Sequence, residues 1–204
     1  MALALWALFG LTAVVARVLI HWRRTGTTGV RGISGKVGSA EWFGGVAFVA
    51  ATVLGVAAPV LDEVDLVDPI GGLDGVGTQV AGVVLYVVGL AELLWSQRAL
   101  GRSWRIGVDE SERTALVTHG PYELVRNPIY TAMMAVFCGL ALIVPSVVAL
   151  ASVVLLVVAL ELQTRLVEEP YLVNAQGEPY ADYAQRAGRF LPGVGRLDPR
   201  RRDR

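Results

Sequence analysis

Two short segments concentrate the side chains of this chain that could do chemistry. The first is HGPYELVRNPIY, from His119 to Tyr130, and the second is EEPYLVNAQGEPYADY, from Glu168 to Tyr183. Their tyrosines, arginine and carboxylates bind ligands through hydrogen bonds and charge. The two segments flank the most hydrophobic stretch of the sequence. Because polar groups are costly beside lipid, their position predicts a working site where membrane helices meet water.

Membrane helices must hold these segments in place. The chain has 204 residues, a hydrophobic fraction of 54% and a mean hydropathy of +0.53. Apolar windows close to membrane-spanning length cover Leu3–Ile20, Trp42–Leu61, Val76–Trp95 and the long block Pro128–Val167. Pro145 and Ser146 should divide the last block into two helices, because proline removes a helix hydrogen bond and clashes with the preceding turn. The sequence therefore predicts five spans.

The distribution of charge predicts how the spans are oriented. Residues 62–74, between the second and third windows, include five acidic residues and no basic one. With five spans, all 18 Lys and Arg residues lie on the other side or at the helix ends on that side. The positive-inside rule places that side in the cytoplasm. We therefore expect a multi-pass membrane protein with its amino terminus outside and its carboxyl terminus and active site in the cytoplasm.

The expected fold class is an all-α integral membrane protein with five transmembrane helices and a short cytoplasmic cap. The loop before the fourth helix and a carboxyl-terminal amphipathic helix over Gly177–Gly188 form this cap. Leu116 and Val117 are expected in a short extended segment that leads into the turn at His119. Asn127 is expected to cap the fourth helix, with Pro128 in its first turn.

The chain divides by composition into three parts. Residues 1–95 are expected to hold the first three helices and a glycine-rich cytoplasmic loop. Residues 96–192 hold the segments that carry chemistry and the last two helices, and 193–204 form a basic tail. This tail suits a surface of anionic lipid, at roughly 1 kcal/mol per basic residue, or a solvated end. Membrane lipids are expected partners, and nucleic acid is not.

Metal chemistry is not expected. The chain has a single cysteine, Cys138, which excludes an internal disulfide and a cysteine-based metal cluster. Its two histidines, His21 and His119, are far apart in the sequence and argue against a zinc site.

Four blocks of the carboxyl-terminal half occur together in a known family. They are ALGRSWRI (Ala99–Ile106), LVTHGPYELVRNPIY (Leu116–Tyr130), the pair Glu168-Glu169, and GEPYADYAQRAGRFLP (Gly177–Pro192). Together they resemble the isoprenylcysteine carboxyl methyltransferase-like integral membrane methyltransferases. The resemblance implies S-adenosylmethionine as cofactor and S-adenosylhomocysteine as product. It also implies a lipophilic small-molecule, prenyl or lipid acceptor that is delivered from the membrane.

The resemblance also implies a division of roles. The residues expected to bind the cofactor are Leu116, Val117, His119, Gly120, Tyr122, Arg126, Asn127, Pro128, Tyr130 and Glu169. Arg165 and Glu168 are expected to be catalytic, and the residues expected to bind the acceptor are Arg165, Glu92 and Trp104. Tyrosine rings suit an adenosine group, and charged side chains suit the amino-acid end of the cofactor. Glu169→Ala or Tyr130→Ala is expected to weaken cofactor binding, and Arg165→Ala to stop turnover alone.

Structural interpretations stand beside several of these roles. Glu161 and Arg165 are four residues apart, so they also suit an ion pair along one helix face. Glu92 also suits a hydrogen-bonding role inside the bundle, and His119 a role in stabilising its turn. A pair of carboxylates at the carboxyl end of a helix opposes the helix dipole. Glu168-Glu169 therefore predicts a positive partner nearby.

One departure from the family bears on the choice of acceptor. The family usually has Arg-His-Pro where this chain has Arg126-Asn127-Pro128. Asparagine donates and accepts hydrogen bonds but takes up no proton near neutral pH. A carboxylate acceptor needs no base, because it is already ionised, so isoprenylcysteine-like O-methylation is favoured. The alternatives are methylation of a phospholipid amine or a thiol, a sterol-reductase-like NADPH enzyme, and a non-catalytic membrane protein.

Overall fold

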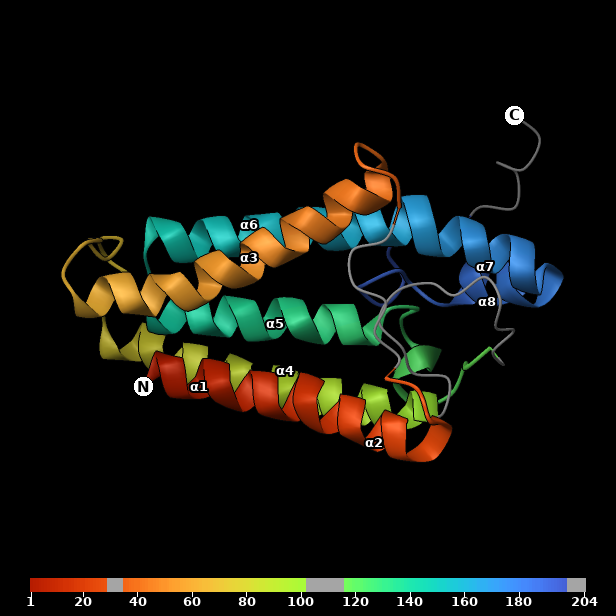
Figure 1. Ribbon diagram of the computed structural model, residues 1–204, viewed down its shortest axis with the longest axis horizontal. Helices are drawn as coiled ribbons and strands as arrows, with labels where there is room; N and C mark the ends of the chain where they lie inside the picture. The colour runs from red at the N-terminus through yellow and green to blue at the C-terminus, as the bar shows by residue number, and fades with distance from the viewer. Residues whose placement is uncertain (29–34, 102–115, 198–204) are drawn as a thin grey trace.

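The chain forms an elongated bundle of helices in the computed structural model, which describes residues 1–28, 35–101 and 116–197 (Figure 1). The elements in chain order are α1 (Ala2–Phe9), the π-helical turn η1 (Gly10–Val15), α2 (Ala16–Thr25), α3 (Ala40–Glu63), α4 (Val76–Leu100), the 3-10 turn η3 (Gly120–Glu123), α5 (Pro128–Ile143), α6 (Val147–Leu162), the π-helical turn η4 (Gln163–Glu168), α7 (Glu169–Gln176) and α8 (Glu178–Arg186). The main helix pairs are α4 with α5 and α3 with α6. Figure 1 shows α5 lying between the α3–α6 layer and the layer of α1, α2 and α4.

Four stretches of helix are long and apolar enough to cross a membrane. They are Ala2–Thr25, Ala40–Glu63, Val76–Leu100 and Val147–Gln176. Helix α5 is apolar but has only 16 residues, a length of about 24 Å against a hydrocarbon core of about 30 Å. The all-helical membrane fold is thus established, and the predicted count of five spans stays a prediction.

Glycines let α4 and α5 approach closely. A Cβ atom at Gly139 would lie 2.7 Å from the carbonyl oxygen of Gly82, and a Cβ at Gly82 would lie 2.6 Å from that of Gly139. Close packing of small residues is a main source of helix association in lipid, because burying apolar side chains against another helix gains little there. The seam between α4 and α5 thus fixes the start of α5 beside the end of α4.

The first helix packs against α5 through aromatic side chains. The Trp6 and Phe137 ring centroids are 4.8 Å apart and the rings are edge-to-face, and those of Phe9 and Phe137 are 6.1 Å apart in the same arrangement. Edge-to-face pairs of this kind add about 0.5–1.5 kcal/mol beyond the area that they bury. They hold one face of the first helix against the core of the bundle.

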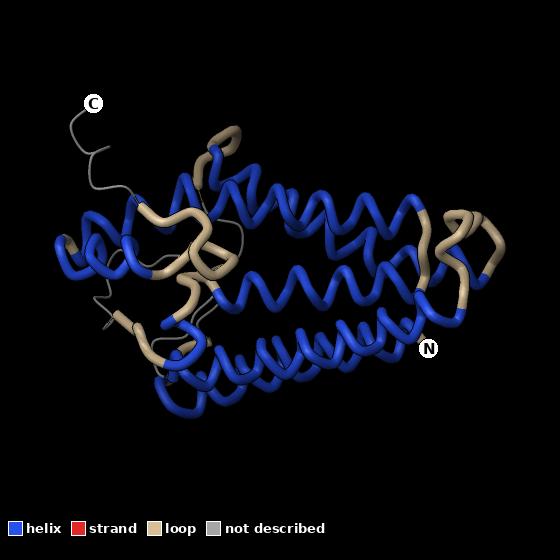
Figure 2. The backbone as a smooth tube through the Cα atoms, turned by 180° about the vertical axis from the view of Figure 1, so that it is seen from behind, coloured by secondary structure: helices blue, strands red, loops and turns tan. Residues whose placement is uncertain are grey.

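A cap closes the end of the bundle where α5 begins. The backbone N–H groups of Arg126 and Asn127 donate to the carbonyl oxygens of Gly188 (2.8 Å) and Arg189 (3.1 Å), and Gly188 N–H donates to Leu124 (3.1 Å). The side chains of Tyr180 and Tyr183 on α8 form a buried cluster beneath this contact. Figure 2 shows the loops gathered at the two ends of the bundle. The two predicted parts of the cap therefore meet, and its cytoplasmic location stays a prediction.

Two local predictions are confirmed. Helix α5 ends at Ile143 and α6 begins at Val147, on either side of Pro145 and Ser146. The Ser146 hydroxyl caps α6 by accepting a hydrogen bond from the backbone N–H of Ala149 at 3.2 Å. The short helix expected after Gly177 is α8.

Three local predictions are wrong. The Asn127 side chain does not cap α5, because its Nδ2 donates instead to the carbonyl oxygen of Arg189 at 3.2 Å. Residues 116–118 have no regular secondary structure, so Leu116 and Val117 do not form a strand. Glu168 and Glu169 do not end a helix, since η4 passes directly into α7 with Pro170 in its first turn, where a proline needs no N–H partner.

Candidate functional site

Tyr130 and Glu168 meet where α5 begins. The Tyr130 hydroxyl donates a hydrogen bond to Glu168 Oε1, and both side chains are half-buried. Tyr130 lies in the first turn of α5, and Glu168 is the last residue of η4. Gln163, at the start of η4, also forms a side-chain hydrogen bond with Glu168. Single π-helical turns occur frequently at functional sites, because the wider turn re-aims side chains.

Glu169 is held by two arginines inside the cap. Arg126 Nη2 lies 2.5 Å from Glu169 Oε1, and Arg189 Nε and Nη2 lie 2.8 Å from Oε1 and Oε2. The side chains of Arg126 and Glu169 are only 2% and 9% exposed. The hydrogen bonds to Glu169 raise the pKa of Arg189. The positive partner expected near the glutamate pair is therefore present, and it binds Glu169.

The remaining contacts of Arg126 tie the cap together. Its Nη1 donates to the carbonyl oxygens of Ala184 (3.1 Å) and Ala187 (2.7 Å), and its Nη2 donates to that of Gly195 (3.0 Å). These oxygens belong to α8 and the segment that follows it. A guanidinium offers five N–H donors, and four bonds of Arg126 end on its own protein. Arg126 therefore holds the shape of the site.

Three buried tyrosines lie in the cap near this network. The Tyr183 hydroxyl donates to the Tyr122 carbonyl oxygen at 2.6 Å, which joins α8 to η3. Burial raises the pKa of Tyr180 to about 12, and burial also raises the pKa of Tyr183 and of Tyr122 above the ordinary range. All three hydroxyls therefore keep their protons at physiological pH.

The other residues that were expected to bind the cofactor lie along the segment that leads into α5. His119 is exposed, and Gly120 has a φ of +63°, a left-handed conformation that glycine adopts without strain. Leu116 packs against the tyrosine cluster of α8, Val117 is half-buried, and Pro128 is buried at the start of α5. The structure thus brings most of the predicted set to one end of the bundle.

Of the three residues expected to bind the acceptor, Arg165 and Glu92 lie in the described part of the chain. Arg165 Nε is paired with Glu161 Oε2, and the Arg165 side chain is 57% exposed. Glu92 is half-buried on α4, two turns before the end of that helix. Trp104 lies outside the described residues. The ion pair on one helix face is therefore present, and the acceptor role of these residues stays a prediction.

Sequence reasoning missed three buried polar side chains at this end of the bundle. Arg17 on α2 is 6% exposed, and its Nη2 donates to the Gly101 carbonyl oxygen, just after α4. The hydroxyls of Ser96 and Thr164 are buried and have no hydrogen-bond partner among the described residues. A charged residue inside an apolar span, as at Arg17, is the signal that could have identified the first of these.

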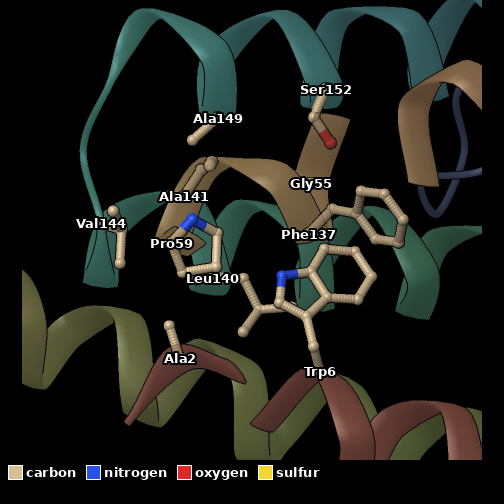
Figure 3. Close-up of a pocket in the computed structure, with 11 residues that line it drawn as sticks. Ala2, Trp6, Gly55, Pro59, Phe137, Leu140, Ala141, Val144, Ala149 and Ser152 are labelled. Carbon is tan, nitrogen blue, oxygen red and sulfur yellow. The ribbon is translucent and has the colours of Figure 1, made fainter. Parts of the chain in front are cut away.

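A small cavity lies at the opposite end of the bundle (Figure 3). Its volume is about 10 Å³, and Trp6, Pro59, Phe137 and Ser152 are among its lining residues. This volume suits at most a single water molecule. Among the described residues, no group of three His, Cys, Asp or Glu side chains could hold a metal ion.

Comparison with known proteins agrees with this geometry. Residues 78–178 match the phospholipid methyltransferase family, and this range runs from the start of α4 through η3, α5 and η4 to the start of α8. The fold is similar to that of the eukaryotic intramembrane Ras methyltransferase, isoprenylcysteine carboxyl methyltransferase, with a TM-score of 0.69 and 17% identity over 95% of this chain. The resemblance to isoprenylcysteine carboxyl methyltransferase-like membrane methyltransferases is thereby confirmed.

A curated relative matches a little less than half of the chain. The nickel-cobalt-cadmium resistance protein NccN of Alcaligenes xylosoxydans xylosoxydans is 31% identical over 94 residues, which make up 46% of this chain. The match covers 44% of that relative, and the match to the solved methyltransferase covers 66% of its chain. The present chain is therefore aligned with only part of each.

Proposed function

We propose that this protein is a membrane methyltransferase that uses S-adenosylmethionine and methylates a lipophilic acceptor. The observation that carries the proposal is the Tyr130–Glu168 hydrogen bond at the start of α5. It places a carboxylate beside an aromatic ring inside the region that matches the phospholipid methyltransferase family. The overall similarity to a solved intramembrane methyltransferase supports the same function.

The residues at this end of the bundle fit the proposed cofactor. Glu168 hydrogen-bonds to Tyr130 and Gln163, whereas Glu169 is held by two arginines. The Glu168 carboxylate therefore suits the ammonium group of the amino-acid end of the cofactor. We propose that the adenosine group lies against Tyr122 and Leu116, and that the buried Thr164 hydroxyl, which lacks a partner among the described residues, is a further polar contact. The bound cofactor supplies an activated methyl group.

The roles of the other predicted residues follow from their contacts. Arg126, Asn127 and Glu169 support the site, because each is bonded to the carboxyl-terminal part of the cap. We propose that Arg165 and Glu92, both accessible at least in part, contact the acceptor. Methyl transfer needs an aligned nucleophile and little competing water, and alignment alone supplies about 7–11 kcal/mol of the barrier. The cap supports both needs.

A carboxylate is the acceptor that the residues favour. Asn127 stands where the family has histidine, so this position offers no proton acceptor near neutral pH. A carboxylate acceptor is already ionised and needs none. An exposed Arg165 suits the binding of such an anion, provided that the acceptor displaces Glu161 from the ion pair. Isoprenylcysteine-like O-methylation therefore leads the proposal.

A phospholipid amine is the second candidate. The match of residues 78–178 to the phospholipid methyltransferase family is the observation that favours it. An amine is protonated near neutral pH and must lose a proton before it attacks. The half-buried Glu92 is a candidate to bind an ammonium group of this kind. In either case we propose that the site faces the cytoplasm and the amino terminus lies outside.

Calorimetric titration of the detergent-purified protein tests the cofactor. Saturable binding of S-adenosylhomocysteine, with no binding of NADPH, is the expected result. Binding of NADPH alone would indicate a reductase, and binding of neither compound by folded protein would indicate a non-catalytic role. With the cofactor established, labelled methyl donor is offered with S-farnesyl-N-acetylcysteine and with phosphatidylethanolamine. Label in the first product alone supports the carboxylate, and label in the second alone supports the amine.

A further inference from the structure

Helix α5 is shorter than the bilayer is thick, and the missing length falls at the end beside the cap. The 16 residues of α5 are about 24 Å long, about 6 Å less than the hydrocarbon core. At its far end α5 is separated from α6 only by residues 144–146, and α6 begins a candidate span of its own. The start of α5 therefore lies beneath the membrane boundary on the cap side.

Trp95 on the neighbouring helix marks the depth of that boundary. Helices α4 and α5 run antiparallel, because Gly82 meets Gly139 and Gly89 meets Ala132. Trp95 is six residues after Gly89, so it lies level with the segment just before α5. The Trp95 side chain is 57% exposed on a candidate span. Because exposed tryptophans favour the level of the lipid headgroups, the boundary passes close to the residues that precede α5.

Residues 188–194 form a strap that covers this short end of α5. The backbone N–H groups of Arg126 and Asn127 donate to its first two carbonyl oxygens. One helical turn further into α5, the Thr131 hydroxyl donates to the Phe190 carbonyl oxygen at 2.7 Å. Hydrocarbon offers no partner to polar groups at this depth, so they must be paired within the protein. The strap supplies these pairs and reaches one turn below the start of the helix.

The strap ends in a turn with exposed apolar side chains. Leu191 and Val194 are 58% and 60% exposed, and the Val194 N–H donates to the Leu191 carbonyl oxygen at 3.1 Å. Pro192 has no N–H, so one backbone donor fewer needs a partner there. Arg196 Nη2 would lie 3.7 Å from a Cβ atom at Gly193, so a cation lies over the turn. Apolar side chains beside a cation are typical of a segment at the boundary between acyl chains and headgroups.

We propose that the turn of residues 191–194 enters the bilayer on the cap side and contacts acyl chains through Leu191 and Val194. The strap then makes up the thickness that α5 lacks and separates the polar start of this helix from lipid. Tyr130 lies between the two attachment points of the strap, Asn127 and Thr131, so the lipid surface comes within about one helical turn of the candidate site. The inference concerns the membrane fold alone and requires no methyl transfer.

Quenching of a fluorescent label by lipid tests the inference. Leu191→Cys and Val194→Cys, each in a Cys138→Ser background, carry a bimane label in phosphatidylcholine vesicles. Part of the lipid is 5-doxyl or 12-doxyl phosphatidylcholine, which quenches near the headgroups or near the bilayer centre. Val154→Cys, exposed midway along α6, is the membrane control, and Gln185→Cys, exposed on α8, is the water control.

The expected pattern is specific to a shallow position in the leaflet. Both turn labels should lose fluorescence with 5-doxyl lipid and lose less with 12-doxyl lipid. The Val154→Cys label should show the opposite order, and the Gln185→Cys label should change little with either lipid. Iodide, which stays in water, should quench only the Gln185→Cys label.

Two other patterns would overturn the inference. Quenching of the turn labels by iodide and not by doxyl lipid would place the turn in water. Protection from both quenchers, lost when the protein is diluted in detergent, would assign the turn to a contact between two copies of the chain. The two turn positions are measured separately, so a folding defect in one variant leaves the other to decide.

Discussion

Arg126 and Glu169 are 43 residues apart in the chain and form a buried ion pair 2.5 Å long. The pair fastens α7 to the segment that leads into α5. Glu168, the adjacent residue, points instead to Tyr130. The two consecutive carboxylates thus have different environments: Glu169 is paired with two arginines, and Glu168 is half-buried beside a tyrosine. Their substitutions should therefore have different consequences.

Glu169→Ala should destabilise the cap. It leaves Arg126 and Arg189 without their carboxylate, and removing one partner of a buried pair costs about 3–5 kcal/mol. Thermal unfolding in detergent should show a clear fall in the midpoint temperature. Glu178→Ala, which removes an exposed carboxylate from α8, is the control and should leave the midpoint unchanged. Loss of S-adenosylhomocysteine binding with unchanged stability would return Glu169 to the cofactor-binding role expected from the sequence.

Glu168→Gln should weaken cofactor binding with little effect on stability. The amide keeps a hydrogen-bond acceptor for Tyr130 but loses the charge that suits an ammonium group. The loss of a charged hydrogen bond predicts about a tenfold or greater fall in S-adenosylhomocysteine affinity. Calorimetry on Glu168→Gln and on Glu178→Gln measures the difference. Equal affinities in both variants would remove Glu168 from the site.

Arg165→Ala should stop methyl transfer while S-adenosylhomocysteine still binds. If Arg165 holds an anionic acceptor, the variant loses turnover and Glu161→Gln keeps it. If the two residues only stabilise their helix, each variant should cost no more than about 0.5 kcal/mol, the usual worth of an exposed pair four residues apart. Transfer of labelled methyl groups, measured beside calorimetry, separates these cases. Equal turnover in both variants would show that Arg165 has no acceptor role.

Gly139→Ala should loosen the seam between α4 and α5. The added Cβ would lie 2.7 Å from the Gly82 carbonyl oxygen and from the Tyr86 backbone nitrogen, so the backbones must separate. Overpacking of this kind costs about 1–3 kcal/mol. Gly77→Ala, also at this helix pair but with no atom within 4 Å of the new Cβ, is the matched control. A lower unfolding midpoint is expected for the first variant only, and similar midpoints would mean that the seam tolerates the methyl group.

Single cysteines should report the predicted orientation. In a Cys138→Ser background, Thr27→Cys lies in the first loop and Asp68→Cys in the second, and both positions are exposed. The charge pattern predicts that an impermeant maleimide labels only the Asp68→Cys protein in intact cells. Both proteins should react once the cells are permeabilised. Labelling of Thr27→Cys alone in intact cells would show that the orientation is the opposite of the predicted one.

The helices could be predicted well because each depends on local sequence. The break at Pro145 and Ser146 and the helix after Gly177 follow from the chemistry of those residues alone. The helix through Glu168 and Glu169 could not be predicted in this way. A glutamate pair before proline looks like a helix end, but the buried Arg126 and the half-buried Arg189, from distant segments, hold Glu169 in a continuous helix there.

The candidate site could be predicted only as a group of residues. The blocks around Tyr130 and Glu168 were identified correctly as neighbours, because both lie at the ends of apolar stretches. The different roles of Glu168 and Glu169 depend on the fact that arginines from distant segments reach Glu169 and not Glu168. Arg17 was missed because the first helix has no recognisable motif, and its position beside Gly101 depends on how that helix packs.

The carbonyl oxygens that bind Arg126 also determine when the cap can form during synthesis. The carbonyl oxygens that surround its guanidinium come from residues 58 to 69 positions later in the chain. When the ribosome has just added Arg126, none of those partners exists. The apolar helices before it are then ready to enter the bilayer, whereas the cap at the start of α5 is assembled only near the end of translation. A newly made chain therefore passes through a stage in which its first helices can already enter the membrane and its cap has not yet formed.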